Sequence, residues 1–303
     1  MQERKGRFSL LLEWGASWYI MGGAFSALLN REVGWINSST TTGSGVENVV
    51  FTGQDDTQFG FTYPDNAYYG YFGGREFEEK RYEDLRAVIS GHSMIQNICV
   101  LDDSDIYTIE DLVGKKIAIG PPGSGTNVFA QQLMEFYGFE MYKDWTPEWL
   151  SHVDGVDALR NRTVDAHFLS GPVPYVIYTE LAMTHDVRFI GIEEEKLEGF
   201  VTLHPYWFPS KLEAGAYRGH DEDILVVGTI TMIVTNKNVP DDVVYELVRV
   251  IYDNPDKVTD AHASYGPEWI PENALKGIAI PLHPGAVRAL EEFGVDIPEN
   301  LIP

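Results

Sequence analysis

Residues 116–127, KIAIGPPGSGTN, decide the fold of this chain. The apolar run at 116–119 predicts a buried strand, the glycines that follow predict a tight turn, and a helical pattern begins near Val128. Such a turn leaves the first backbone N–H groups of the helix pointing outward, where an anion or a carbonyl oxygen can accept their hydrogen bonds. The stretch therefore predicts a strand–turn–helix unit with a ligand site at the turn, residues 120–127.

This turn has some of the spacing of a nucleotide-phosphate loop. Gly120 and Gly125 match the first two glycines of G-x-x-x-x-G-K-[ST], but Thr126 and Asn127 stand where that motif requires Lys and Ser or Thr. Because the lysine that holds the phosphates is missing, we interpret the turn as a cradle for a small anionic or polar solute. A tight turn that only caps the helix is the alternative.

Composition bounds the class of protein. The chain has 303 residues with 44% hydrophobic content, which is enough for two globular lobes. Its 22 Lys and Arg against 46 Asp and Glu give a formal charge of -24, which argues against binding to nucleic acid or to an anionic membrane surface. An anionic ligand would have to be held by helix N-termini and hydroxyl groups, or by one or two focused arginines.

The sequence indicates the cellular compartment of the protein only indirectly. Cys99 is the single cysteine, so the chain cannot form an internal disulfide, and its apolar neighbours predict a small buried side chain. No apolar run approaches the roughly 18 residues of a membrane span, and no hydrophobic signal core follows the first residues. We expect either a cytoplasmic protein or a mature form whose signal has been removed.

The strand–turn–helix arrangement recurs along the chain. A strand at 8–12 precedes a helix that we expect Ser17 to cap, with Trp18 and Phe25 on its buried face. A strand at 33–37 precedes the polar turn 38–45 and a short helix at 46–50. A strand at 165–169 precedes the turn Ser170-Gly171 and a helix at 175–183. The four turns thus occupy equivalent positions.

Other segments give weaker signals. The Tyr- and Gly-rich residues 63–74 have no clear pattern, residues 146–148 resemble a helix start, and residues 206–219 resemble a loop. The acidic residues 102–105 lack the spacing, central Gly and closing Glu of a calcium loop, so we expect a solvated turn.

Alternating strands and helices predict parallel α/β sheets, whose ligand sites lie beyond the carboxyl ends of the strands. The long β-rich segments 93–101 and 224–235 predict crossings between two α/β lobes. We place lobe I at residues 1–98 and 225–303 and lobe II at residues 99–224. This layout predicts a clamp that closes on a solute by hinge motion of the crossing segments.

Five ordered motifs resemble the extracytoplasmic solute-binding proteins of TRAP transporters, of the TAXI type. Residues 15–23, GASWYIMGG, are similar to the family opening G-G-T-Y-Y-P-L-G-G, and residues 42–48, TGSGVEN, are similar to its T-G-G-S-V-E-N turn. Residues 113–126 are similar to its L-K-G-K through G-A-P-G-S-G-T segment, and residues 165–172 and 281–286 continue the match. The resemblance covers nearly the whole chain.

The resemblance implies a type II periplasmic-binding-protein fold, with two α/β lobes joined by a hinge of crossing β segments. It implies a periplasmic, monomeric protein with no catalysis, cofactor or metal, which delivers a solute to TRAP membrane permease subunits. The implied solute is a small carboxylated organic molecule, such as the amino acid glutamate or a di- or ketocarboxylate.

Carried over by position, the implied ligand-binding residues are Ser17, Trp18, Tyr19, Thr42, Gly43, Ser44, Gly45, Asn48, Ser124, Gly125, Thr126, Asn127, Ser170 and Gly171. Hydroxyl groups and helix N-termini in this set suit a carboxylate, and the rings suit its carbon chain. Trp18 could instead belong to the buried face of its helix, so we favour Tyr19 as the ligand contact. We expect the 120–127 turn to be exposed when the clamp is open.

Two departures from the family pattern fall in this predicted pocket. Trp18 stands where members often have Tyr, and Ser44-Gly45 stands where they have Gly-Ser, which moves a hydroxyl by one position. Both changes bear on which carboxylated solute fits.

Two other classes remain open. An enzyme on the same fold lacks support, since the chain has no H-E-x-x-H or G-x-S-x-G and its eight histidines are scattered. We expect His283 to be structural and to pack the C-terminal segment. A ligand sensor that signals to a membrane receptor has the same sequence features as a transport protein.

Overall fold

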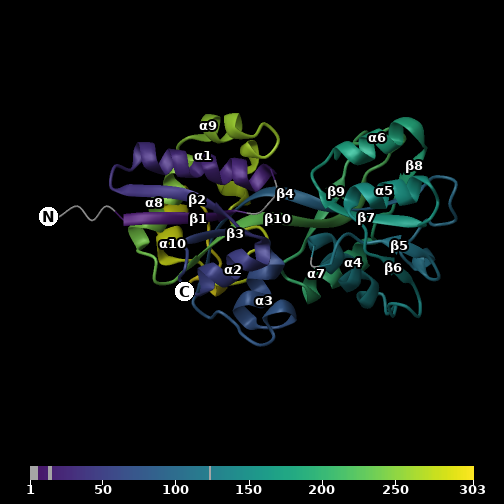
Figure 1. The fold of residues 1–303 in the computed structure, drawn as a ribbon, viewed down its shortest axis with the longest axis horizontal. Helices are drawn as coiled ribbons and strands as arrows, with labels where there is room; N and C mark the ends of the chain where they lie inside the picture. Colours follow the sequence, from purple (N-terminus) through teal and green to yellow (C-terminus); the bar gives the residue numbers. More distant parts are fainter. Residues whose placement is uncertain (1–5, 13–15, 123) are drawn as a thin grey trace. The chain divides into compact units, whose positions relative to one another are not determined.

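The structure is a computed structural model that describes residues 6–12, 16–122 and 124–303. The chain forms two compact α/β units (Figure 1). Unit 1 comprises Met1–Ser93 and Ile230–Pro303, and unit 2 comprises Met94–Thr229. The strands β4 (Leu85–Leu101) and β10 (Ile224–Asn236) each contribute residues to both units. The predicted α/β class with crossing β segments is confirmed.

The sheet of unit 1 is mostly parallel. Its first three strands are β1 (Gly6–Leu12), β2 (Ile36–Thr42) and β3 (Phe59–Thr62). β1 pairs in parallel with both β2 and β3, and β10 pairs antiparallel to β3. The polar turn predicted at 38–45 is wrong in its first half, because residues up to Thr42 belong to β2. There β2 pairs with β1 residue by residue from Ile36 to Thr42, and β-branched threonines suit a strand.

Six helices of the described chain surround this sheet, and their bounds are α1 (Ala16–Glu32), α2 (Gly45–Gly53), α3 (Pro64–Phe72), α8 (Asp241–Tyr252), α9 (Pro255–Ala261) and α10 (Pro284–Glu292). The predicted inward face of α1 is confirmed, since Trp18 and Phe25 are buried. The helix begins at Ala16, so Ser17 lies within its first turn and not before it, as a cap would. The unassigned stretch 63–74 contains α3, whose first residue, Pro64, is favoured at a helix start.

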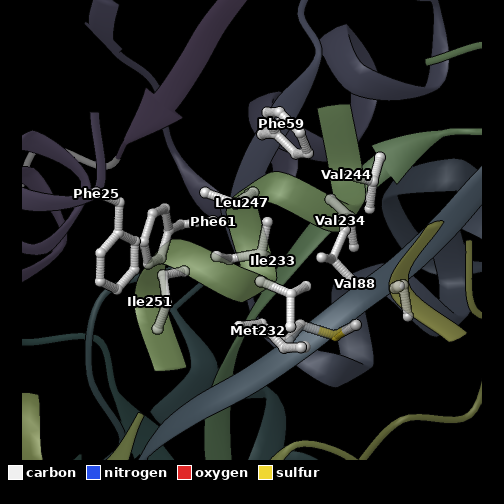
Figure 2. Close-up of a cluster of buried hydrophobic side chains, with 14 of the residues drawn as sticks. Phe25, Phe59, Phe61, Val88, Met232, Ile233, Val234, Val244, Leu247 and Ile251 are labelled. Atoms are coloured by element: carbon white, nitrogen blue, oxygen red, sulfur yellow. The ribbon is translucent and has the colours of Figure 1, made fainter. Parts of the chain in front are cut away.

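The core of unit 1 lies between this sheet and its helices (Figure 2). Met232, Ile233 and Val234 from β10 are buried there with Leu247 and Ile251 from α8. Consecutive buried residues on β10 show that both faces of this strand are covered.

An aromatic group occupies the same core. Trp269 packs edge-on against Phe25 and Phe61, with ring centroids 4.9 and 5.6 Å away. Its indole lies over Gly91 of β4, where an added Cβ would fall 2.2 Å from the ring. Gly91 is therefore required by the close approach of Trp269.

The C-terminal segment is attached to β4 through its backbone. Ala87 donates to the carbonyl of Pro281, and its own carbonyl accepts from the backbone N–H of His283. The buried imidazole of His283 caps α10, because its Nδ1 accepts from the N–H of Gly285 at 3.1 Å. The predicted structural role of His283 is confirmed.

The strands of unit 2 are β5 (Lys116–Ala118), β6 (Thr146–Glu148), β7 (Ala166–Gly171), β8 (Val187–Phe189) and β9 (Phe208–Leu212). β5 pairs in parallel with both β6 and β7, and β4 pairs antiparallel to β7 and β8. The helix start predicted at 146–148 is wrong, because these residues pair with β5 as an edge strand, where Pro147 is tolerated. The loop predicted at 206–219 contains β9, which pairs with β10.

The helices of unit 2 within the described residues are α4 (Gly125–Phe136), α5 (His152–Arg160), α6 (Val176–Thr184) and α7 (Glu194–Leu203). Successive residues of β7 face opposite sides of the sheet. Phe168 lies near Phe129 of α4, whereas His167 contacts Tyr178 of α6. None of the helices described in either unit is both long enough and apolar enough to cross a membrane.

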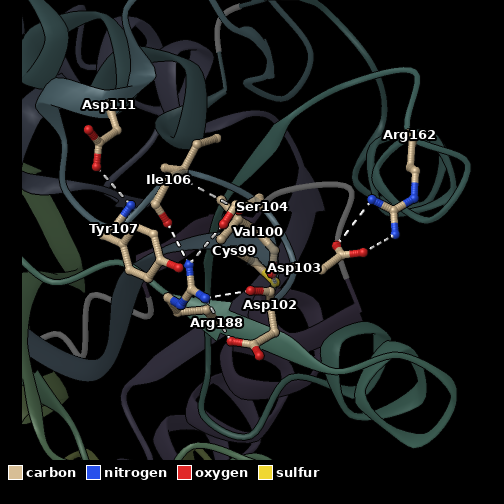
Figure 3. A network of polar contacts seen from close by, with 10 residues as sticks. All are labelled: Cys99, Val100, Asp102, Asp103, Ser104, Ile106, Tyr107, Asp111, Arg162 and Arg188. Atoms are coloured by element: carbon tan, nitrogen blue, oxygen red, sulfur yellow. Dashed lines mark hydrogen bonds and ion pairs between the residues drawn. The ribbon is translucent and has the colours of Figure 1, made fainter.

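The acidic segment 102–105 forms a turn on the surface of unit 2, as predicted (Figure 3). Asp103 accepts two hydrogen bonds from Arg162, and Asp102 pairs with Arg188 at 2.9 Å. The Arg188 guanidinium also lies 3.9 Å from the ring centre of Tyr107. These contacts satisfy the carboxylates, and in the parts that the structure describes no group of three acidic, His or Cys side chains could hold a metal ion.

Candidate functional site

In unit 1, the turn after β2 leads into the N-terminus of α2. Ser44 caps this helix, because its Oγ accepts from the N–H of Glu47 at 3.2 Å and the Glu47 carboxylate accepts from the N–H of Ser44 at 2.8 Å. The two glycines that flank this cap, Gly43 and Gly45, are buried. The predicted residues 43–45 therefore form a capped helix start, and the side chain of Thr42 lies outside the described part of the chain.

Gly45 allows a close approach of polar groups. A Cβ added there would lie 3.0 Å from Asn66 Nδ2, 3.6 Å from Thr62 Oγ1 and 3.7 Å from the Trp18 ring. Thr62 also donates to the carbonyl of Gly45 at 2.9 Å. The sequence reasoning missed Thr62 and Asn66, although Thr62 is the last residue of β3 and Asn66 lies in the first turn of the helix that follows, where the same rule located the other turns.

The side chains of Asn48 and Trp18 donate hydrogen bonds to other residues of unit 1. The amide of Asn48 is buried and donates to the carbonyl of Phe61 at 2.7 Å. Trp18 is 2% exposed, and its Nε1 donates to Thr231 Oγ1 at 2.9 Å. These are the contacts of core residues, whereas Tyr19 is 53% exposed. The side chain of Ser17 lies outside the described part.

In unit 2, the 120–127 turn leads into α4. Ser124 caps this helix, since its Oγ accepts from the N–H of Asn127 at 3.3 Å, and Gly125 is the first helical residue. Thr126 Oγ1 accepts from the backbone N–H of Ser170 at 2.9 Å. The structure thus brings together two of the predicted turns, 120–127 and Ser170-Gly171.

Two positions of the 120–127 turn are buried in this structure. Thr126 is 2% exposed and Asn127 is 4% exposed. Both side chains lie in the first turn of α4, and the hydroxyl of Thr126 is held against the end of β7 through Ser170.

Asn127 has one satisfied and one unsatisfied polar atom. Its Oδ1 accepts from Gln131 Nε2 at 2.7 Å. Its Nδ2 is buried and has no hydrogen-bond partner among the residues that the structure describes. A buried donor without an acceptor costs about 1–3 kcal/mol, so such a group at a predicted ligand site indicates a place for an acceptor atom.

Ser170 is held by a residue that sequence reasoning missed. Gln96 of β4 is 2% exposed, and its Nε2 donates to Ser170 Oγ at 3.0 Å. Gln96 and Ser170 are direct partners in the β4–β7 ladder. No signal in the sequence pairs them, because strand register depends on the whole sheet.

The histidines beside the 120–127 turn are neutral. A Cβ at Gly120 would lie 2.9 Å from Ser124 Oγ and 3.3 Å from Cε1 of His152, so this imidazole borders the turn. Burial lowers the pKa of His152, and it lowers the pKa of the neighbouring His167 to about 3. No ion pair in the described ranges includes a predicted site residue. The polar groups that we describe at this turn are therefore uncharged.

Comparison with known proteins identifies the family of this chain. Residues 13–294 match the model of the NMT1-like family, so the chain belongs to that family.

Solved structures with the same fold include solute-binding proteins. The periplasmic aliphatic sulphonate binding protein SsuA from Escherichia coli has a TM-score of 0.55 at 14% identity, over 95% of this chain and 83% of that one. A TctC solute binding protein from Polaromonas has a TM-score of 0.56 at 14% identity, over 95% and 96%. The protein XAC2383 from Xanthomonas citri, bound to ATP, has a TM-score of 0.58 at 12% identity, over 95% of both chains. The chain shares their two-lobed fold.

Proposed function

We propose that this chain is the solute-binding subunit of a TRAP secondary transporter of the TAXI type. It works in the periplasm as a monomer without catalysis, captures a small organic anion by closure of its two lobes and delivers it to the membrane permease subunits. Lobe I is residues 1–98 and 225–303, and lobe II is residues 99–224. Membership of the NMT1-like family and the fold of the neighbours support this proposal.

One observation supports an anion as the proposed solute. The buried Nδ2 of Asn127, without an acceptor in the described residues, lies at the N-terminus of the 12-residue helix α4. The helix dipole favours negative charge at this place. The neighbours named for an aliphatic sulphonate and found with ATP also have anionic ligands.

In this proposal, the ligand contacts are those implied by the family resemblance. Tyr19 is the ring contact, and Trp18 supports it from the core. The polar contacts are Ser17, Thr42, Gly43, Ser44, Gly45, Asn48, Ser124, Gly125, Thr126, Asn127, Ser170 and Gly171.

A thermal-shift screen tests the class of solute. Glutamate, succinate, 2-oxoglutarate and propane-1-sulphonate are compared with neutral sugars and with cations. A ligand at 100 times its Kd stabilises the folded state by about 2.7 kcal/mol, so we expect a clear rise in Tm with at least one anion. A rise with sugars or cations alone would contradict the proposal.

Asn127→Asp is expected to weaken binding of that anion by about 100-fold or more, because a carboxylate replaces the unpartnered N–H donor and repels the ligand. Isothermal titration measures the loss. Asn161→Asp adds the same charge at an exposed position after α5 and serves as the matched control. Equal affinities of the two variants would remove Asn127 from the site.

A further inference from the structure

Three hydroxyl oxygens at the N-terminus of α4 accept hydrogen bonds from N–H groups of the protein. Gln96 Nε2 donates to Ser170 Oγ at 3.0 Å, and the backbone N–H of Ser170 donates to Thr126 Oγ1 at 2.9 Å. A third hydroxyl, that of Ser124, accepts from the N–H of Asn127 at 3.3 Å. Each of these three hydroxyl oxygens therefore already receives a proton from the protein.

This arrangement favours one way for the hydroxyl groups to act. A hydroxyl has a single proton to donate, and its oxygen can accept two hydrogen bonds. An N–H already occupies one acceptor position of each oxygen, whereas the proton of each hydroxyl is left to be donated to another atom. The amide of Asn127 agrees with this polarity, since its oxygen is taken by Gln131 and its Nδ2 has no acceptor in the described chain.

Gln96 is well placed to impose this polarity. It is 2% exposed, and the ladder pairs Ile95 with Gly171 and Gln96 with Ser170, which holds its amide next to the Ser170 hydroxyl. The Gln96 side chain does not belong to either turn. Its Nε2 is bonded to Ser170, and its Oε1 is buried and has no hydrogen-bond partner among the residues that the structure describes.

We propose that Gln96 is a positioning residue that makes this half of the site specific for an oxyanion, a group that accepts several hydrogen bonds and donates none. Carboxylates and sulphonates meet this requirement. An ammonium group offers no acceptor to these donors, and the neutral oxygens of alcohols and primary amides are weaker acceptors than an oxyanion, so these groups bind less tightly. This inference rests on the proposed function, because it assigns the chemical group that the proposed solute presents to unit 2.

Two substitutions at Gln96 test the inference by isothermal titration. In Gln96→Met the donor is lost while the length of the side chain is kept, so the Ser170 hydroxyl is free to turn, and anion binding should weaken by about 5- to 10-fold. In Gln96→Glu the carboxylate accepts the proton of Ser170 and adds a negative charge, so binding should weaken by about 100-fold or more. The probes are glutamate, succinate and propane-1-sulphonate, with succinamide as the neutral counterpart of succinate.

The control is Gln132→Glu, which changes a buried glutamine of the same unit. The Gln132 amide donates to Tyr206 and accepts from Trp207, and neither contact is at the predicted site. We expect this variant to lose stability without losing the preference for the anion. For Gln96→Glu, the ratio of succinate to succinamide affinity should fall.

The outcomes separate the two proposals. Wild-type protein that binds none of these anions would overturn the proposed function and this inference together. Wild-type protein that binds an anion, with Gln96→Glu within about twofold of it or with the same ratio of succinate to succinamide affinity, would overturn this inference alone.

Discussion

Trp269→Ala is expected to lower the free energy of unfolding by about 4 kcal/mol, since large-to-small changes of buried aromatic residues cost about 3–5 kcal/mol. Trp269 is 1% exposed and contacts Phe25 and Phe61 across the core of unit 1. Gly91 beneath the indole has no side chain that could fill the cavity. Urea unfolding followed by circular dichroism measures the change.

Two further variants test whether lost packing causes the destabilisation expected for Trp269→Ala. The indole Nε1 of Trp269 is buried and has no partner among the described residues, so Trp269→Phe removes an unsatisfied donor along with part of the ring. We expect it to cost about 1 kcal/mol or less. Trp149→Ala serves as the control, because Trp149 is 37% exposed and should lose much less than Trp269. Equal losses in the two alanine variants would contradict the packing account.

Acid is expected to destabilise the protein by about 3 kcal/mol between pH 7 and pH 5. Burial lowers the pKa of His92 and of His167 from 6.5 to about 3. Between these values the unfolded chain binds more protons than the folded chain, so stability falls as the pH falls below 6.5. Each histidine contributes about 1.4 kcal/mol per pH unit, or about 2 kcal/mol by pH 5.

Two carboxyl groups whose pKa is raised by burial act in the opposite direction. Burial raises the pKa of Asp65 from 3.8 to about 6, so the folded chain binds the additional proton between these values. Its protonation restores about 1 kcal/mol by pH 5. Glu268, whose pKa is also raised by burial, acts in the same sense. The two histidines outweigh this gain.

Urea titrations at pH 7 and pH 5 measure the net effect. His167→Gln keeps a polar group near Tyr178 and removes one titrating group, so it should reduce the loss from about 3 to about 1 kcal/mol. A midpoint that does not move between the two pH values would contradict the assignment of neutral buried histidines.

The features that could be predicted from the sequence are local ones. The strand before Gly120 and the helix after it depend on a short apolar run, a glycine turn and a Ser cap within a dozen residues. The buried face of α1 likewise follows from the spacing of its apolar residues. The fold class followed because several such units alternate along the chain.

The features that could not be predicted depend on partners far apart in the sequence. The Ser- and Thr-rich residues 38–42 read as a turn until β1 is placed beside them, and residues 146–148 become a strand only through β5. The candidate site shows the same limit. The turns at Thr126 and Ser170 were predicted separately, whereas the bond between them and the contact of Gln96 with Ser170 required the register of β4 and β7.

That register has a consequence for how the protein could diversify. Gln96 and Ser170 are 74 positions apart in the sequence, yet they share one hydrogen bond. If Gln96 positions Ser170 as proposed, a lineage that changed only one of them would pass through a form that binds the solute less well, because the effects of contacting residues are not additive. A shift to a different class of solute would therefore require the two positions to covary, and selection should leave the pair as a correlated signature among descendants.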